Sequence, residues 1–176
     1  MAVKINASIA YGEYLKSGVL NHNIGTGNFT VGGWVRLDGN QAWNSFWANG
    51  SAGLAPAIPM YRTAAGTPWN WYWGADSGDF NTSLTNGTWY AVVMRRLGTT
   101  ISGWINGVQD ATTGTSSQSV ANAAQWIGET GGGDYAQQSV AHWFLARAAW
   151  GTGEIKAFAA GRNPMSIRRG VVAYAT

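Results

Sequence analysis

The sequence predicts an all-β protein, an antiparallel two-sheet jelly-roll β-sandwich with one short helix near residues 153–160. Short apolar segments, several of them with a period of two, recur along the chain between glycine-rich turns. The pair Asn106-Gly107 is the strongest hairpin signal, because both residues tolerate the positive φ of a type I′ turn. The composition agrees: 11 Trp and 25 Gly accompany only 11% charged residues, which suits a sandwich better than a disordered chain.

The first half of the chain predicts strands separated by loops. The doublet Gly32-Gly33 lies inside one of them and allows either a bulge or a close approach of another backbone. Residues 77–84 are polar and are expected to form a loop or an edge. The expected strands are Val3–Ala10, Glu13–Val19, Phe29–Leu37, Ser45–Ala48, Ala57–Thr63 and Trp69–Trp73.

The second half predicts a three-stranded meander. Residues 89–94 are apolar at every position, as in a strand buried on both faces, and Arg95 and Arg96 are expected to end it in solvent. Strands over 101–106 and 108–112 follow, and Val140–Ala146 forms a later strand. A helix over Glu154–Ala160 is expected to begin at a Thr152 cap and to stop at Gly161, with Ile155, Phe158 and Ala159 on its apolar face.

These segments carry a resemblance to a known family. The strand at Phe29–Leu37, the Trp-Ile-Asn-Gly hairpin at 104–107 and the late strand that runs into Gly-Glu-Ile resemble the laminin-G-like, concanavalin A-like jelly-roll superfamily. The resemblance covers residues 28–161. It implies the same sandwich for this chain, and it leaves open a carbohydrate-binding, lectin-like module.

The end of the chain, residues 159–176, also looks like the ending of laminin-G-like proteins carried by phages and prophages. That resemblance implies a non-enzymatic virion structural protein, either a capsid decoration (cement) protein or a tail-associated one. Such a protein would be made in the host cytoplasm and carried in the virion. Its expected partners are other virion proteins, further copies of itself, with a trimer suiting local three-fold points, and host-surface glycans.

Composition sets further limits on the function. The length of 176 residues suits a single domain, 1–176. The absence of cysteine gives no disulfide framework, and we expect neither a signal peptide nor a membrane span. The net charge of +3 comes from scattered basic residues, which argues against a nucleic-acid partner.

Three tryptophans at alternate positions are the candidate glycan contacts. Trp69, Trp71 and Trp73 lie on one face of their predicted strand, since side chains alternate with period two. Flat aromatic rings of this kind can stack on sugars. The alternative is that the same rings fill the sandwich core, where large aromatic side chains usually lie.

Three aspartates are the candidate metal ligands. The resemblance implies no obligatory cofactor, but calcium is common among these relatives and needs several oxygen ligands. Asp76 and Asp79, in a glycine-rich loop, are the main candidates, and Asp134 is a further one. The alternative is that they are ordinary loop residues that help the chain to turn.

Acidic residues also decide the expectation about catalysis. Glycoside hydrolases of this fold place paired carboxylates along one strand in an E-x-D-x-x-E pattern, which this sequence lacks. A glucanase-like enzyme is therefore the least favoured alternative, and no catalytic residue is predicted. There is also no cysteine and no G-x-S-x-G motif to supply a nucleophile.

The C-terminal region is the expected contact surface with other proteins. Arg162, Arg168 and Arg169 precede a final strand that contains Tyr174, and protein interfaces favour arginine and aromatic residues. We expect this strand to pair with Val3–Ile9 or with a neighbouring subunit by strand addition.

Overall fold

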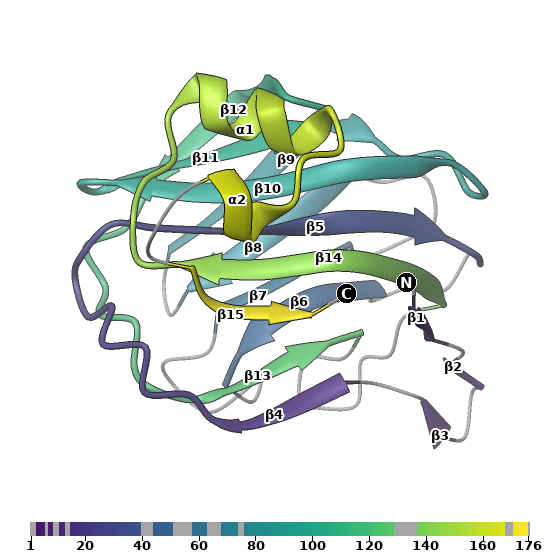
Figure 1. Cartoon of the computed structure of the whole chain (residues 1–176), viewed down its shortest axis with the longest axis horizontal. Coiled ribbons are helices and arrows are strands. Elements are labelled where there is room, and N and C mark those ends of the chain that lie inside the picture. The colour runs from purple at the N-terminus through teal and green to yellow at the C-terminus, as the bar shows by residue number, and fades with distance from the viewer. Residues whose placement is uncertain are drawn as a thin grey trace.

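The computed structural model consists mainly of antiparallel strands in two large sheets, with two short helices over one face (Figure 1). It describes residues 3–5, 7–8, 11–12, 15–39, 44–50, 58–62, 68–73, 76–128, 137–167 and 171–175. This arrangement confirms the predicted antiparallel β-sandwich.

The larger sheet contains seven strands. Its order is β1-β14-β5-β10-β11-β12, and β15 also pairs with β14. The strands are β1 (Val3–Ile5), β14 (Gln138–Ala146), β5 (Phe29–Leu37), β10 (Trp89–Leu97), β11 (Thr100–Ile105), β12 (Val108–Thr115) and β15 (Val171–Ala175). Neighbours run antiparallel, so short turns can join consecutive strands.

The smaller sheet contains six strands, in the order β4-β13-β6-β7-β8-β9. They are β4 (Leu15–Val19), β13 (Ala124–Ile127), β6 (Asn44–Asn49), β7 (Ile58–Arg62), β8 (Pro68–Trp73) and β9 (Asp76–Ser83). Strands β7 and β8, both predicted, pair with each other, with Met60 opposite Trp71. Two further strands, β2 (Ala7–Ser8) and β3 (Tyr11–Gly12), pair only with each other.

Apolar side chains between the two sheets form the main core. In β5, the residues predicted to face inward are buried there, among them Val31, Val35 and Leu37. Phe46 and Trp69 meet them from the smaller sheet and pack edge to face, with ring centroids 5.8 Å apart. Alternation with period two thus fills the space between the sheets.

The hairpin of β11 and β12 turns at the predicted residues. Asn106 and Gly107 have φ values of 51° and 78°, as a type I′ turn requires. The side-chain oxygen of Asn106 also accepts a hydrogen bond of 2.9 Å from the Ala91 N–H in the neighbouring strand β10. The turn is therefore anchored to the sheet.

A second core lies on the outer face of the larger sheet, beneath α1 (Thr152–Ala159) and α2 (Pro164–Ile167) (Figure 1). Phe144 of β14 stacks on Trp150 with ring centroids 4.3 Å apart, and Phe158 of α1 packs edge-on against Phe144 at 5.0 Å. Ala91 and Val93 of β10 face this core, whereas Val92 and Met94 face the other. The uninterrupted apolar run of β10 follows from its position between two cores.

The helix ends differ in part from the prediction. Helix α1 begins after Gly151, not at a Thr152 cap, and Glu154 accepts a 2.6 Å hydrogen bond from the Gly151 N–H. Gly161, with φ of 90°, follows the helix as predicted. Helix α2 was not expected. Its signal is the pair Asn163-Pro164, because the Asn163 side chain accepts a hydrogen bond from the Met165 N–H and proline suits the first helical position.

Strand β14 changes its outer neighbour along its length. Strand β1 pairs with residues 138–140, and β15 pairs with residues 143–146. The expected pairing of the final strand with Val3–Ile9 is therefore wrong. The nine residues of β14 offer an edge long enough for both short strands, and the two ends of the chain lie close together along it (Figure 1).

Candidate functional site

The tryptophans predicted as glycan contacts are largely core residues. Trp69 and Trp71 expose only 0% and 3% of their surface. The ring of Trp71 lies against Gly78 of β9 and Gly114 of β12, which have no side chains to obstruct it. These two rings cannot stack on a sugar from solution, so the core alternative holds for them. Trp73 pairs with Asp76 in the β8–β9 register, and its side chain lies outside the described part of the structure.

Asp76 and Asp79 lie in strand β9 rather than in a loop. They are three residues apart in a regularly paired segment, so their side chains point to opposite faces. Asp79 is exposed and accepts a hydrogen bond from the Asn70 side chain on the outer face. The two carboxylates therefore cannot share one calcium ion. Asp134, the further candidate, lies outside the described residues. The described residues contain no group of three His, Cys, Asp or Glu side chains that could hold a metal.

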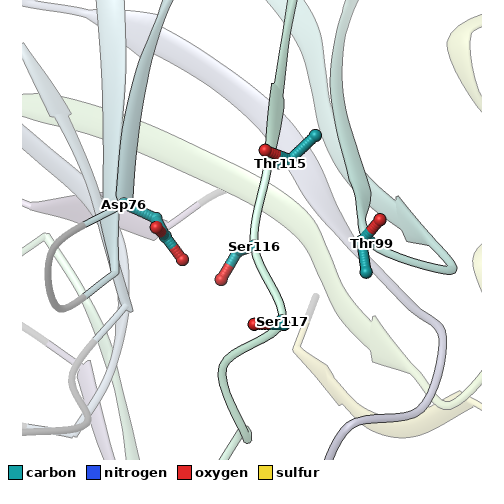
Figure 2. Close-up of a pocket in the computed structure, with 5 residues that line it drawn as sticks. All are labelled: Asp76, Thr99, Thr115, Ser116 and Ser117. Atoms are coloured by element: carbon teal, nitrogen blue, oxygen red, sulfur yellow. The ribbon is translucent and has the colours of Figure 1, made fainter.

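Asp76 instead lines a pocket at the rim of the sandwich (Figure 2), which we call the hydroxyl pocket. Its volume is about 350 Å³. The other lining residues that the structure describes carry hydroxyl groups: Thr99, Thr115, Ser116 and Ser117. They come from the β10–β11 turn and from the end of β12, and Figure 2 shows the Ser116 and Ser117 hydroxyls on the side of the chain that faces Asp76.

Backbone bonds hold the hydroxyl-bearing segments together. The Ser116 N–H donates to the Thr99 carbonyl over 2.8 Å, which joins the turn to the segment after β12. The Ser116 hydroxyl accepts a hydrogen bond of 3.2 Å from the Gln118 N–H. The pocket was not predicted, because residues 112–122 are rich in Ser, Thr and Gln and have no regular apolar pattern. The available signal was a run of hydroxyl residues directly after a strand.

Arg96 supports the same region from inside. It was expected in solvent, but only 1% of its surface is exposed. Its guanidinium donates to the carbonyls of Gly25, Gly27 and Gln118, and it lies 5.3 Å from the centroid of the Phe29 ring. Burial lowers the pKa of Arg96 to about 10, so the group stays charged at neutral pH.

A buried polar network joins the loop of residues 20–24 to strands β6 and β13. The Ile24 N–H donates to His22 Nδ1, so the His22 Nε2–H donates to Asn49 Oδ1 over 3.1 Å. Asn49 Oδ1 also accepts from the Gln125 amide, and the Trp47 indole donates to Gln125. Burial lowers the pKa of His22 below its ordinary value of 6.5, with a smaller opposing effect from the Asn49 hydrogen bond.

The remaining described carboxylates serve the fold. Asp110 accepts hydrogen bonds of 2.6 and 2.9 Å from the Asn81 and Thr82 N–H groups and so joins β12 to β9. Asp38 forms an ion pair of 2.7 Å with Arg36. Among the described acids, Asp76 alone lines the hydroxyl pocket.

A second pocket, of about 240 Å³, lies on the outer face of the larger sheet. We call it the aromatic pocket. Its lining residues come from β5, β10, β14 and the end of α1, and they are Trp34, Trp89, Ala141, His142 and Gly161. None of these residues was predicted as a binding residue, and His142 lies in the strand predicted over Val140–Ala146.

The predicted protein-contact residues are only partly placed. Arg162 is exposed just after α1, and the backbone of Tyr174 in β15 pairs with Phe144 of β14. Arg168 and Arg169 lie outside the described residues. No helix in the described part of the chain is long and apolar enough to cross a membrane.

Solved structures of three other proteins share this fold. A Bacteroides ovatus protein, provisionally described as carbohydrate-binding, superposes with a TM-score of 0.74 at 13% identity over 99% of this chain and 50% of its own. A heptameric SAP-like pentraxin from Limulus polyphemus gives 0.68 at 13% identity, over 90% of this chain and 80% of its own. Trypanosoma rangeli sialidase gives 0.63 at 16% identity, over 90% of this chain and 29% of its own.

The chain thus spans half of the Bacteroides protein and less than a third of the sialidase, and these low identities establish the fold alone. No curated protein sequence matches the chain significantly. The laminin G profile described as "Concanavalin A-like lectin/glucanases superfamily" matches residues 10–159, most of the chain. This protein therefore belongs to the concanavalin A-like lectin/glucanases superfamily.

Proposed function

We propose that this protein is a non-catalytic carbohydrate-binding domain. The observation that carries the proposal is the hydroxyl pocket, in which a single carboxylate, Asp76, is accompanied by four hydroxyl side chains. A Bacteroides protein of the same fold, described provisionally as carbohydrate-binding, supports the same ligand class.

The chemistry of the pocket matches that of a sugar edge. A carboxylate accepts hydrogen bonds through both oxygens, and serine and threonine hydroxyls both donate and accept. Neighbouring hydroxyl groups on a sugar ring can therefore donate to Asp76 and exchange hydrogen bonds with Thr99, Thr115 and Ser117. Hydrogen bonds to an ionised group are the stronger ones, so Asp76 is expected to contribute most.

The same pocket argues against glycoside hydrolysis. A retaining glycosidase needs two carboxyl groups about 5 Å apart, and an inverting one needs them roughly 6.5–9.5 Å apart. Asp79 faces away from the pocket, and Asp110 is occupied by two backbone N–H groups. Asp76 is the one acid at the pocket among the residues that the structure describes, and one acid can orient a sugar but cannot serve as both proton donor and nucleophile.

A matched pair of aspartate variants tests the proposal. Wild-type protein, Asp76→Ala and Asp79→Ala would be applied to a glycan array, and hits would be measured by calorimetry. We expect Asp76→Ala to weaken binding by roughly tenfold or more, and Asp79→Ala to bind like wild type. The two residues share one strand, so the control removes the same charge from the opposite face.

Two results would overturn the proposal. One is unchanged glycan binding by Asp76→Ala, or no binding by any of the three proteins. The other is hydrolysis of a bound glycan by the wild type that is lost in Asp76→Ala, which would make the protein an enzyme.

We also propose a second role, as a phage virion component that assembles through its C-terminal region. It rests on the resemblance of residues 159–176 to the ends of phage-borne proteins, and the exposed Arg162 beside α1 is available for contacts. Deleting the final strand would strip β15 from the sheet, so a point variant is the better probe. Light scattering of the wild type and of Arg162→Glu tests this role. The role is supported if the wild type forms an oligomer, such as a trimer, and Arg162→Glu dissociates it. The role is contradicted if the wild type is a monomer and does not bind virions.

A further inference from the structure

Strand β14 contains a bulge whose first residue has an unusual backbone. His142 has φ of 52°, one of only three non-glycine residues with positive φ in the described chain. In the pairing with β5, Trp34 lies opposite Ala141 and Gly32 lies opposite Phe144, so His142 and Trp143 share the place opposite Gly33. Glycine is the usual residue at a left-handed bulge position, because a side chain makes that conformation costly.

The bulge changes which side chains reach the outer face. Val140 and Trp143 are buried between the sheets, and Phe144 is buried beneath the helices. With strict alternation, the side chains of residues 140 and 143 would point to opposite faces of the sheet. The extra residue of the bulge allows both to point to the inner face. As a result, the successive residues Ala141 and His142 both line the aromatic pocket. Bulges commonly redirect a side chain in this way at functional positions.

Of the strands that the structure describes, neither β1 nor β15 pairs with β14 at His142. Strand β1 pairs with β14 up to Val140, and β15 pairs from Trp143 onward. Helices α1 and α2 cover the middle of the sheet face and leave the strand ends near β1 uncovered (Figure 1). The residues that line the aromatic pocket are themselves partly or fully exposed, so the pocket is open to solvent.

The two tryptophans of the pocket are held in place before any ligand arrives. Trp89 of β10 pairs with Arg36, so Trp34, two residues before Arg36 on β5, is its diagonal neighbour on the same face. The Trp34 ring packs against Phe158 of α1, with centroids 6.3 Å apart. The Arg36 guanidinium lies 5.5 Å from the centroid of the Trp89 ring.

Arg36 is itself restrained by an ion pair. Its guanidinium donates to Asp38 over 2.7 Å and to the Ser139 hydroxyl over 3.3 Å, and Ser139 donates to Asp38. Both indoles thus lose little freedom on binding, which favours affinity. The charge of Arg36 is balanced by Asp38, so the pair gives the pocket no net charge.

These features select a class of ligand. A volume of about 240 Å³ is below the roughly 300–1,000 Å³ of pockets for drug-sized molecules and suits a single ring. The described lining contains no carboxylate, and Arg36 already occupies a face of Trp89, so a quaternary ammonium group gains little. A pyranose ring fits better, because its apolar C–H face can lie on an indole while its hydroxyl edge meets the His142 imidazole.

We propose that the aromatic pocket is a second saccharide site, specific for one neutral pyranose ring, and that the β14 bulge exists to place His142 in it. The site is separate from the hydroxyl pocket and does not depend on Asp76. If both sites act, the domain binds a glycan at two places.

Nuclear magnetic resonance titration tests the site directly. The probes are the methyl glycosides of glucose, galactose, mannose and N-acetylglucosamine, with choline as the cationic comparison. Trp34→Phe and Trp89→Phe assign the two indole N–H signals. We expect at least one neutral glycoside to shift both signals, and choline to shift neither.

Two variants and two controls complete the test. Trp89→Ala and His142→Gly should each weaken that binding by roughly tenfold or more. His142→Gly should keep the wild-type unfolding midpoint, because glycine accepts the bulge conformation without strain. Trp126→Ala, which removes an indole from the smaller sheet, and Asp76→Ala should bind the glycoside normally.

Several outcomes would overturn the inference. Choline shifting the indole signals in place of every glycoside would reject the ligand class, and no shift with any probe would reject the site. A His142→Gly protein that binds normally would show that the bulge serves only the fold. If Asp76→Ala loses the indole shifts, the two pockets are one site. If no protein binds the glycan array but the glycosides still shift the indole signals, only the hydroxyl pocket is rejected.

Discussion

The two pockets of this protein differ in what holds their walls in position. The hydroxyl pocket lies where strands end, and its walls are a turn and an irregular segment. Apart from the backbone bond between Ser116 and Thr99, this segment is held from inside by the buried guanidinium of Arg96, which is bonded to carbonyls of two loops. The aromatic pocket lies on the face of a sheet, and its walls are three neighbouring strands, paired regularly except at the β14 bulge, together with Gly161.

This difference predicts two kinds of fragility. A pocket held by side chain–carbonyl bonds should fail when one side chain is removed. A pocket held by strand register should tolerate most side-chain changes and fail when the backbones are forced apart. Variants of Arg96 test the hydroxyl pocket, and a variant of Gly32 tests the aromatic pocket.

Replacement of Arg96 by methionine should destabilise the loops around the hydroxyl pocket and have the largest effect on stability. The variant removes the guanidinium that donates to the Gly27 and Gln118 carbonyls, whereas the Gly25 carbonyl keeps the Val120 N–H. We expect a loss of about 3 kcal/mol or more in the free energy of unfolding. Urea denaturation measures this loss. Hydrogen exchange should rise first in residues 116–120 and remain low in β5.

Arg96→Lys is the matched control. Lysine keeps the charge but lacks the planar fork that reaches several carbonyls at once, so its loss should be intermediate. A methionine variant as stable as wild type would mean that these loops are held by other contacts.

Replacement of Gly32 by alanine should destabilise the pairing of β5 with β10 beneath the aromatic pocket. An added Cβ would lie 2.7 Å from the Val92 carbonyl and 2.8 Å from a Val93 methyl, so β5 and β10 would have to separate. Overpacking of this kind costs roughly 1–3 kcal/mol. Thermal unfolding measures it, and the indole N–H signals of Trp34 and Trp89 should move as the register shifts.

Gly18→Ala is the control for this change. A Cβ at Gly18 in β4 would meet no atom within 4 Å, so alanine should be neutral there or slightly stabilising. Equal effects at Gly18 and Gly32 would show that backbone entropy, and not close packing of β5 against β10, explains the result.

Acid should weaken the folded protein through His22, whose buried imidazole bonds to Asn49 of β6. Burial lowers the pKa of His22 below 6.5, so the unfolded chain binds a proton at a pH where the folded chain does not. The stability from neutral His22 is complete above pH 6.5 and is lost as the pH falls from there through the folded pKa, by at most about 1.4 kcal/mol per pH unit.

Denaturant unfolding between pH 7 and pH 5 checks this expectation against His22→Gln, which does not titrate. The variant should be less stable at neutral pH but should show a flatter pH profile. Identical slopes in the two proteins would assign the acid sensitivity to groups other than His22.

The sequence was informative where local chemistry decides the structure. Asn106-Gly107 determined a turn, and the doubly apolar run of β10 reflected its two cores. Alternation in β8 correctly placed Trp69 and Trp71 on one face, but it could not say whether that face meets solvent or the other sheet. Only the approach of Gly114 from β12 shows that Trp71 is enclosed.

Both pockets escaped sequence analysis because each joins residues distant in the chain. Asp76 meets residues 99 and 115–117, and Trp34 meets Trp89 and His142. The bulge at His142 arises from pairing with β5 and leaves no local signature apart from the opposed Gly33. Arg96 read as solvent-exposed because a cation at a strand end usually is, and its carbonyl partners lie some 70 positions earlier and 22 positions later.

The smallest expected effect concerns the residue on which the proposed function rests. No hydrogen bond joins the Asp76 side chain to a residue that the structure describes, whereas Asp110 bonds two backbone N–H groups of β9. Asp76→Ala should therefore change the free energy of unfolding by no more than about 0.5 kcal/mol, and Asp110→Ala should cost about 1.5–3 kcal/mol. Calorimetric unfolding of both variants measures the contrast. An Asp76→Ala protein as unstable as Asp110→Ala would mean that Asp76 supports the fold, and its loss of glycan binding would then no longer identify a ligand contact.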